Sequence, residues 1–448
     1  MAPSPPNTRI LLLATLDTKL EEATYVLHQL LRSSELRVTV LDIGRNALST
    51  HDAKNLKSQD RVELVSCELD TPAADLPRGD YSSRMGSSAT QRVAGLMKNP
   101  TTAPHGILGI GGSTGSSIVA AVMRDAVAIG LPKLLVSTMA SGDVGHLVGG
   151  VDITLMYSVV DIAGLNFLSE KILGNAAAAM VGMARQYHET SEIQPSESCL
   201  ETRTDGGKRR ERIAITMFGV TTPGVDRIRH MLSQPPHDAE VVVFHATGSG
   251  GRAMETLIRQ GEFDAVIDLT TSEIADEVGG GILSAGPDRL SAGAQAQIPY
   301  IVSVGACDMI NFGPLSSIKP ELVEADKKGE RKLYQHNPSV TLLRTDLEEN
   351  RRIGEFIAEK LVAYQRKDLV KVLLPEESIS MISGDGGPFE DRNADKALFE
   401  TLTEKLKNTG IEIRRQGWDI NGPEFTNAVV DALVEMKQKK KETNRSSP

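Results

Sequence analysis

The sequence predicts an α/β protein made of two Rossmann-like, doubly wound subdomains whose sheets are largely parallel. Apolar runs of strand length alternate with amphipathic runs of helix length in both halves of the chain, which is the order that a parallel sheet requires. Turns rich in glycine and hydroxyl side chains follow several of the apolar runs, as expected where a buried strand leads into a helix. A polar segment at 189–211 lacks apolar periodicity, and we interpret it as the linker between the two subdomains.

The first subdomain is expected over residues 1–188. It begins with the strand pattern RILLLAT at 9–15, a helical pattern at 19–31 and the strand pattern LRVTVLDIG at 36–44. After a polar excursion the same alternation predicts helices at 89–97, 113–129 and 163–187 and strands at 106–110 and 134–137.

The second subdomain is expected over residues 212–437. Its strand patterns are predicted at 212–220, 240–247, 264–270, 300–306, 339–345 and 371–375. Helices are predicted from Pro223 onward and at 252–260, 347–364 and 423–437. The last residues, 438–448, are expected to form a polar tail.

Composition limits the classes of partner. The 448 residues carry a formal net charge of -10 and only 4% aromatic side chains, which argues against nucleic acid and anionic membranes as partners. Three cysteines without a CxxC pair fit a reducing compartment and argue against structural zinc, so we expect no metal site built by the chain. Neither a signal-peptide core nor an apolar stretch of membrane-spanning length is seen, and we expect a cytoplasmic protein.

The turn after the strand at 106–110 is the first candidate for a phosphate site. Glycines let backbone N–H groups approach a phosphate, hydroxyls add donors, and the following helix contributes the positive end of its dipole. The candidate residues of this turn are Gly111, Gly112, Ser113, Thr114, Gly115 and Ser116. An alternative stays open, in which the glycines only turn the chain and Ser113 caps the helix. No lysine follows Gly115, so the turn is not a Walker A loop and a phosphate here needs a cation from elsewhere.

Two further turns follow strands at the same predicted edge. After the first strand, Lys19 could meet a phosphate and Asp17 a magnesium ion or a hydroxyl. The alternative is that Asp17 or Thr18 caps the helix while Lys19 faces water. A long polar connection follows the strand at 134–137, and such connections are often functional. The candidate residues of this connection are Thr138, Ser141 and Gly142.

The second half has a glycine turn of its own, HATGSGGRAMETL. Gly248, Gly250 and Ala253 satisfy the pattern G-x-G-x-x-A between a strand and a helix. Asp268 ends the next strand, where a dinucleotide fold places its ribose-binding acid. The pattern favours NAD as an alternative ligand, although it does not follow the first strand of its series. No residue of the chain is assigned a catalytic role.

Nine segments taken together resemble a known family. They are TLDTK, GIGGSTGSS, VSTMASGDV, YSVVDIAGLN, FGVTTPGVDRI, FHATGSGGRAME, DLTTSEIADEVGGG, SAGPDRL and HNPSVTLLRT. From Arg9 to Val434 the chain is similar to the ATP-binding family typified by the N-terminal inhibitory domain of the tomato mosaic virus resistance protein. The resemblance implies two Rossmann-like subdomains, a bound ATP and a homodimer. It places the nucleotide on the matching segments 17–19, 111–116 and 138–142 and says little about whether ATP is cleaved.

Three functions from different classes therefore remain. The first is a cytosolic ATP-binding protein, an enzyme acting on a small molecule held between the subdomains, with magnesium accompanying ATP. The second is a module that binds another protein under the control of ATP. The third is a nicotinamide-dependent oxidoreductase that uses the turn at 248–253. Of the two glycine turns we expect the first to hold ATP, because it combines backbone donors with three hydroxyl side chains.

Overall fold

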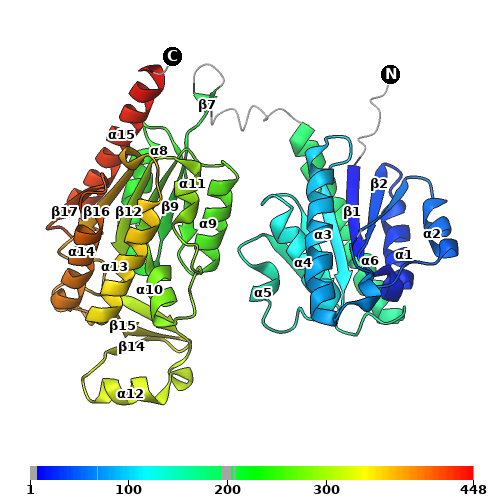
Figure 1. Ribbon diagram of the computed structural model, residues 1–448, viewed down its shortest axis with the longest axis horizontal. Coiled ribbons are helices and arrows are strands. Elements are labelled where there is room, and N and C mark those ends of the chain that lie inside the picture. The colour runs from blue at the N-terminus through cyan, green and yellow to red at the C-terminus, as the bar shows by residue number, and fades with distance from the viewer. Residues whose placement is uncertain (1–7, 68, 193–202, 205–207, 447–448) are drawn as a thin grey trace. The chain divides into compact units, whose positions relative to one another are not determined.

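The computed structural model describes residues 8–67, 69–192, 203–204 and 208–446. The chain divides into two compact units, Met1–Glu201 (unit 1) and Thr202–Pro448 (unit 2). Each unit contains a six-stranded sheet in which all neighbouring strands are parallel and alternate with helices along the chain (Figure 1). The predicted fold class is therefore confirmed.

Unit 1 has the strand order β3-β2-β1-β4-β5-β6. Its strands are β1 (Thr8–Ala14), β2 (Leu36–Asp42), β3 (Val62–Ser66), β4 (Gly106–Gly111), β5 (Lys133–Ser137) and β6 (Ile153–Tyr157). Its helices are α1 (Leu16–Leu31), α2 (Thr50–Lys57), the 3₁₀ turn η1 (Ala73–Asp75), α3 (Arg78–Lys98), α4 (Ser113–Asp125), α5 (Gly145–Val148) and α6 (Phe167–Glu192).

Both faces of the unit 1 sheet are buried. In the central strand β1, Leu12 packs into one apolar cluster with α1 and α6, whereas Leu11 and Leu13 pack into a second cluster with α3 and α4. A strand that is buried on both faces reads as a continuous apolar run, which explains why β1 could be predicted. The edge strands β3 and β6 are partly exposed and were not predicted.

Two glycines of β4 are required by the packing of α4. A Cβ atom at Gly109 would lie 2.3 Å from Cγ1 of Val119, and one at Gly111 would lie 2.6 Å from the backbone nitrogen of Ser116. Both contacts are far closer than carbon atoms tolerate, so helix α4 can lie directly on β4 only where these side chains are missing.

Unit 2 has the strand order β10-β9-β11-β12-β16-β17, a separate antiparallel sheet β13-β15-β14 and the pair β7-β8. Its strands are β7 (Arg203–Thr204), β8 (Lys208–Arg209), β9 (Arg212–Met217), β10 (Glu240–His245), β11 (Ala265–Thr270), β12 (Tyr300–Gly305), β13 (Met309–Phe312), β14 (Leu333–Asn337), β15 (Val340–Arg344), β16 (Val370–Pro375) and β17 (Glu412–Gln416). Its α-helices are α8 (Thr222–Ser233), α9 (Ser249–Arg259), α10 (Ser272–Gly279), α11 (Ser291–Ala296), α12 (Pro320–Lys327), α13 (Leu347–Val362), α14 (Arg392–Leu406) and α15 (Pro423–Ser446). Its 3₁₀ turns are η2 (Gly219–Thr221), η3 (Leu315–Ser317) and η4 (Lys367–Leu369).

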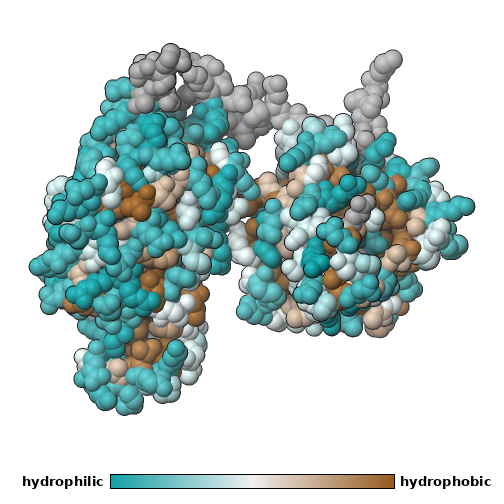
Figure 2. All heavy atoms as spheres, in the orientation of Figure 1, coloured by the Kyte–Doolittle hydropathy of each residue, from teal (hydrophilic) through white to brown (hydrophobic). Residues whose placement is uncertain are grey.

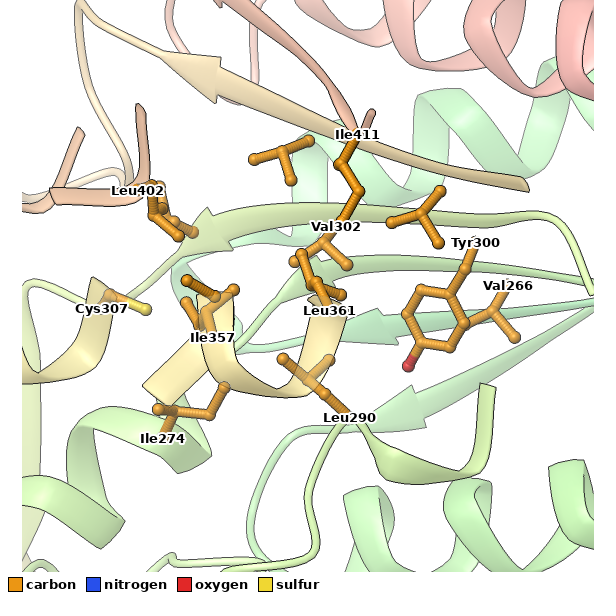
Figure 3. Packing of buried hydrophobic residues seen from close by; sticks show 14 of the residues in the cluster. Val266, Ile274, Leu290, Tyr300, Val302, Cys307, Ile357, Leu361, Leu402 and Ile411 are labelled. Carbon is orange, nitrogen blue, oxygen red and sulfur yellow. The ribbon is translucent and has the colours of Figure 1, made fainter. Parts of the chain in front are cut away.

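The main core of unit 2 lies between its parallel sheet and the helices α13 and α14. Val266 and Val302 project from β11 and β12 toward Ile357 of α13 and Leu402 of α14 (Figure 3). Tyr300 belongs to the same cluster and its hydroxyl donates a hydrogen bond to Oδ2 of Asp268, at 2.8 Å. The carboxyl group of Asp268 is thus buried beside this core.

Three predicted segments differ from the structure or lie partly outside it. The strand predicted at 339–345 is β15, which pairs with β13 and β14 in the antiparallel sheet and is not part of the parallel one. Helix α15 continues to Ser446, so most of the predicted tail is helical, as its lysine and glutamate residues favour. Within the predicted linker, α6 extends to Glu192 and β7 pairs with β8, while 193–202 and 205–207 lie outside the described residues.

Hydrophilic side chains cover most of the visible surface of both units, with small apolar patches among them (Figure 2). Within the described ranges, we find no helix that combines the length and the apolar character needed to cross a membrane.

Candidate functional site

The strand order of unit 1 places a switch point between β1 and β4. The chain runs from β1 outward to β2 and β3, and then returns to β4 before it continues to β5 and β6 on the other side. In an open parallel sheet, the turns at the carboxyl ends of such a strand pair diverge and leave a crevice. Here these turns are the β1–α1 turn at Thr15 and the β4–α4 turn at Gly112.

A cavity of about 440 Å³, which we call cavity A, occupies this crevice. It is lined by Thr15, Asp17, Thr18, Lys19, Arg45, Asn46, Arg78, Tyr81, Gly112, Ser113, Thr114 and Gly115. Two of the three candidate segments from the sequence therefore meet at one place, although nearly a hundred residues separate them in the chain.

Helix α4 begins at the wall of cavity A without a side-chain cap. Its N-cap residue is Gly112, which has no side chain, and its first turn contains no acidic residue. The first N–H groups of a helix have no partner within the helix and carry its positive partial charge. A Cβ atom at Gly112 would meet no atom within 4 Å. The helix start is therefore open to a ligand, and the suggested capping of this helix by Ser113 is not observed.

Arg78 supplies the cation that the sequence does not reveal. It is the first residue of α3, and its Nε donates a hydrogen bond to Oγ1 of Thr114 at 2.9 Å, while Nη2 donates to Oγ of Ser113 at 3.3 Å. The guanidinium is thus held beside the α4 start, and Lys19 lines the same cavity. Arg78 lies in the polar excursion of the sequence, where no motif singles it out.

Asp17 joins the β1–α1 turn to the turn after β2. Its Oδ2 accepts hydrogen bonds from the backbone N–H groups of Arg45 and Asn46, both at 3.1 Å. Its Oδ1 is buried and has no hydrogen-bond partner in the described part of the chain. A Cβ atom at Gly44 would lie only 2.8 Å from this oxygen. The N-cap of α1 is Thr15, which makes no side-chain capping bond, so the suggested capping by Asp17 or Thr18 is not observed.

A second cavity of about 510 Å³, cavity B, adjoins cavity A. It is lined by Arg78, Gly112, Ser113, Thr138, Met139, Tyr157, Ser158, Val159, Val160 and Asp161. The first three of these residues also line cavity A. Val159 has a φ angle of 62°, which is strained for a β-branched side chain. Thr138 thus brings the third candidate segment to the same edge of the sheet.

Four of the candidate residues lie outside the walls of both cavities. Ser116 is fully buried, and its Oγ donates to the carbonyl oxygen of Gly111 at 3.0 Å and lies 2.6 Å from Oγ of Ser137. Gly111 and Ser116 therefore join β4, α4 and β5 beneath the site. Ser141 and Gly142 lie farther along the β5–α5 connection and line neither cavity.

The glycine turn of unit 2 is already occupied by a side chain of the protein. Oε1 of Glu273 accepts hydrogen bonds from the backbone N–H groups of Gly248, at 2.6 Å, and Gly251, at 3.0 Å. These are the donors that a pyrophosphate would require. A Cβ atom at Gly250 would lie 1.9 Å from the carbonyl oxygen of His245, so this glycine is explained by close packing.

Asp268 is unavailable to a ribose. It is fully buried, and Nη1 and Nη2 of Arg289 donate to its two carboxylate oxygens at 2.5 and 2.7 Å. Burial opposes the charge of Arg289, but Asp268 and Glu273 hold its pKa well above the ordinary value. The group is a buried ion cluster of unit 2, and the sequence-based argument for a nicotinamide cofactor does not fit this geometry.

Elsewhere in unit 2, the carboxyl group of Asp276 is buried beneath β13. It accepts hydrogen bonds from the backbone N–H and the side-chain Nδ2 of Asn311, at 2.6 and 2.8 Å. Burial raises its pKa to about 7, against the lowering effect of these bonds. Among the residues that the structure describes, no group of three or more His, Cys, Asp and Glu side chains is placed to hold a metal ion.

The fold and the cavities define a two-unit α/β protein whose first Rossmann-like unit has two adjoining cavities at one edge of its sheet. Residues 8–189 match the N-terminal domain of the Uncharacterised protein family (UPF0261), and residues 210–437 match its C-terminal domain. The chain therefore belongs to this family.

Two curated relatives and one solved structure illustrate its similarities. A UPF0261 protein of Clostridium tetani is 39% identical over 436 residues, covering 97% of this chain and 100% of the relative. The ToMV resistance protein Tm-1(GCR237) of Solanum lycopersicum is 34% identical over 97% of this chain, which spans 56% of that protein. Arabidopsis thaliana UGT89C1 complexed with UDP matches 96% of this chain and 99% of that chain at 11% identity, but its TM-score of 0.26 is too low to carry an argument.

Proposed function

We propose that unit 1 binds ATP, with the phosphates in cavity A. The observation that carries this proposal is the uncapped start of α4 beside the guanidinium of Arg78. Backbone N–H groups at a helix start and a guanidinium are two kinds of donor that suit phosphate oxygens. Both lie at the switch point of a Rossmann-like sheet, where nucleotides bind in such folds.

The charges around cavity A favour a polyphosphate over an uncharged ligand. Arg78 and Lys19 line the cavity, and the α4 dipole adds positive potential, although the chain as a whole carries a formal charge of -10. Asp17 supplies the opposite charge. Asp17 lines cavity A, and a carboxylate at this wall suits the water shell of Mg²⁺. Magnesium would neutralise part of the phosphate charge when bound.

Cavity B is where an enzyme would hold its second substrate. It shares Gly112, Ser113 and Arg78 with the phosphate site, so a molecule in cavity B would lie beside the phosphates. Its wall includes Met139, Tyr157 and Val159, which are 42%, 42% and 55% exposed. An ATP-dependent enzyme acting on a small molecule with an apolar part is the function that this arrangement favours.

The same exposed apolar side chains support a second candidate, an ATP-regulated module that binds another protein. Magnesium-dependent release of phosphate from ATP in the presence of a small acceptor favours the enzyme. Nucleotide-dependent capture of a protein partner, without turnover, favours the module.

Calorimetric titration with ATP and Mg²⁺ tests the proposed site. Arg78→Met should raise the dissociation constant by about tenfold or more, because a hydrogen bond from a charged donor contributes about 1.5–3 kcal/mol. The matched control is Arg84→Met. Arg84 is an exposed arginine of the same helix and lines neither cavity. Equal affinities for the two variants would rule out the proposed phosphate site.

A further inference from the structure

The buried carboxylate of Glu273 occupies the start of helix α9 in the way that a bound anion would. Helix α9 has Gly248 as its N-cap, no side-chain cap of its own and no acidic residue in its first turn. Its first N–H groups therefore need an acceptor from another element. Glu273 lies in the first turn of α10, and its Oε1 accepts from the N–H groups of Gly248 and Gly251 at 2.6 and 3.0 Å.

The glycines of this turn let the carboxylate come close to the backbone. A Cβ atom at Gly251 would overlap the carboxylate of Glu273, so a side chain at this position would displace it. Gly248 has a φ angle of 81°, which residues with a Cβ atom rarely adopt. Glycines have the same use in phosphate-binding turns, where they let backbone N–H groups surround an oxyanion. The turn is thus shaped around an oxyanion, and here the oxyanion is a side chain.

The guanidinium of Arg289 completes the surroundings of this carboxylate. Its Nε donates to Oε2 of Glu273 at 2.8 Å, while Nη1 and Nη2 donate to Asp268. Both Arg289 and Glu273 are 1% exposed, so the pair is closed to water. Backbone donors on one oxygen and a charged donor on the other are what a buried carboxylate requires.

The start of α4 in unit 1 shows what the same kind of turn looks like without such a carboxylate. Its N-cap is also a glycine, Gly112, without a side-chain cap and without an acidic residue in the first turn. A Cβ atom at Gly112 would meet no atom within 4 Å, whereas one at Gly251 would collide with Glu273. The difference between the two turns is therefore the carboxylate that α10 brings to α9.

We propose that Glu273 is an internal ligand of unit 2, whose carboxylate closes the glycine turn to external anions. The contact is autoinhibitory, because the backbone donors and the Arg289 Nε that an anion would use are already satisfied. Once this side chain is shortened, the same donors bind a small monocarboxylate. The inference concerns unit 2 and holds whether or not unit 1 binds ATP.

Urea unfolding of Glu273→Ala in sodium acetate tests this inference. The substitution removes the Cγ atom and the carboxyl group, and these heavy atoms are those of acetate. The urea midpoint should fall in chloride buffer, because the turn and Arg289 lose their acceptor. It should recover in acetate of equal ionic strength. Above the dissociation constant, each tenfold rise in acetate should add about 1.4 kcal/mol to the free energy of unfolding.

The readout and the controls are specific to unit 2. Trp418 is the only tryptophan of the chain, lies in unit 2 and is 37% exposed, so its emission should follow the unfolding of this unit. The matched control is Glu262→Ala, which removes an exposed glutamate that pairs with Arg212. Its midpoint should be the same in acetate and in chloride. Glu273→Gln fills the space of the natural side chain, so acetate should not stabilise it either.

Each other outcome counts against the inference. A Glu273→Ala variant that folds but is stabilised no more by acetate than by chloride would overturn it. An equal response of Glu262→Ala would do the same, because acetate would then act without the turn. A larger response of Glu273→Ala to inorganic phosphate than to acetate would show that the donors do not suit a carboxylate.

The inference stays testable if Glu273→Ala does not fold in chloride buffer. Refolding from urea is then followed by Trp418 emission at increasing acetate concentration. Recovery of the native signal in acetate but not in chloride would support the internal ligand. Failure to refold in acetate as well would overturn it, since the surroundings would then not bind a free carboxylate.

Discussion

Substitution of Gly112 by aspartate tests the phosphate site most directly. A Cβ atom there would meet nothing within 4 Å, and the φ angle of −77° suits any L-residue. Aspartate is also a favourable N-cap residue, with an advantage over glycine of roughly a few tenths of a kcal/mol. We therefore expect Gly112→Asp to fold and to be at least as stable as the natural protein without ligand.

The same carboxylate should exclude the phosphates. It takes the N–H groups of the α4 start and adds a negative charge beside the ligand. Two unit charges 4 Å apart repel by about 1 kcal/mol in bulk water and by about 4 kcal/mol near a protein surface. The dissociation constant for ATP should rise by about fivefold at the lower limit and by several hundredfold at the upper one.

Thermal unfolding gives the readout. Ligand at about 100 times its dissociation constant stabilises the folded state by about 2.7 kcal/mol, which corresponds to about 5–10 °C for a unit of this size. Gly112→Asp should lose most of this shift. Gly95→Asp is the matched control, because Gly95 is an exposed residue of α3 at which an added Cβ atom would likewise meet nothing within 4 Å. Gly250 cannot serve, since its Cβ would lie 1.9 Å from the carbonyl oxygen of His245. An undiminished shift in folded Gly112→Asp would refute the site.

Three further outcomes are expected. Burial raises the pKa of Asp276 from 3.8 to about 7, so the native state holds an extra proton between these values and stability falls as the pH rises through them. Asp276→Asn should abolish this pH dependence because an amide does not titrate, and Asn311 can turn its unpaired Oδ1 toward the new amide group. Urea unfolding at pH 5 and pH 8 checks this, and an unchanged pH dependence contradicts it. Arg289→Met should destabilise unit 2 by about 3–5 kcal/mol, because it leaves the buried carboxylates around Asp268 without their cation. In chemical denaturation, a loss no larger than that of Arg351→Met, which removes an exposed arginine paired with Glu348 of its own helix, would count against this. We also propose a homodimer, and light scattering that finds only a single-chain mass at micromolar concentration would exclude it.

Much of the candidate site could be predicted because its chemistry is local. Asp17, Lys19 and the turn at 112–115 each follow a buried strand directly, and parallel strands bring their carboxyl ends to one edge. Arg78 could not be found in this way, because it contacts Ser113 and Thr114 across 35 and 36 residues of sequence.

The two glycine turns show that a sequence pattern does not by itself predict whether the backbone donors of a turn are free. Both turns join a strand to a helix, and the one in unit 2 matches the dinucleotide pattern more closely. Its backbone donors are nevertheless taken by Glu273, a residue that the pattern does not include. In the part of the chain that the structure describes, no carboxylate caps the turn of unit 1 at Gly112, where an added Cβ atom would meet open space.

The sequence by itself determined the alternation of strands and helices, the division into two parallel-sheet units and the position of the first glycine turn between a buried strand and a helix. These properties depend on hydrophobic periodicity and on neighbouring residues, which the sequence contains explicitly. The tertiary structure alone decided the half-exposed edge strands, the separate sheet around β15, the cation beside α4 and the filling of the second turn. Each of these depends on which distant side chain satisfies a charge or a backbone donor, and that is settled only when the chain is packed.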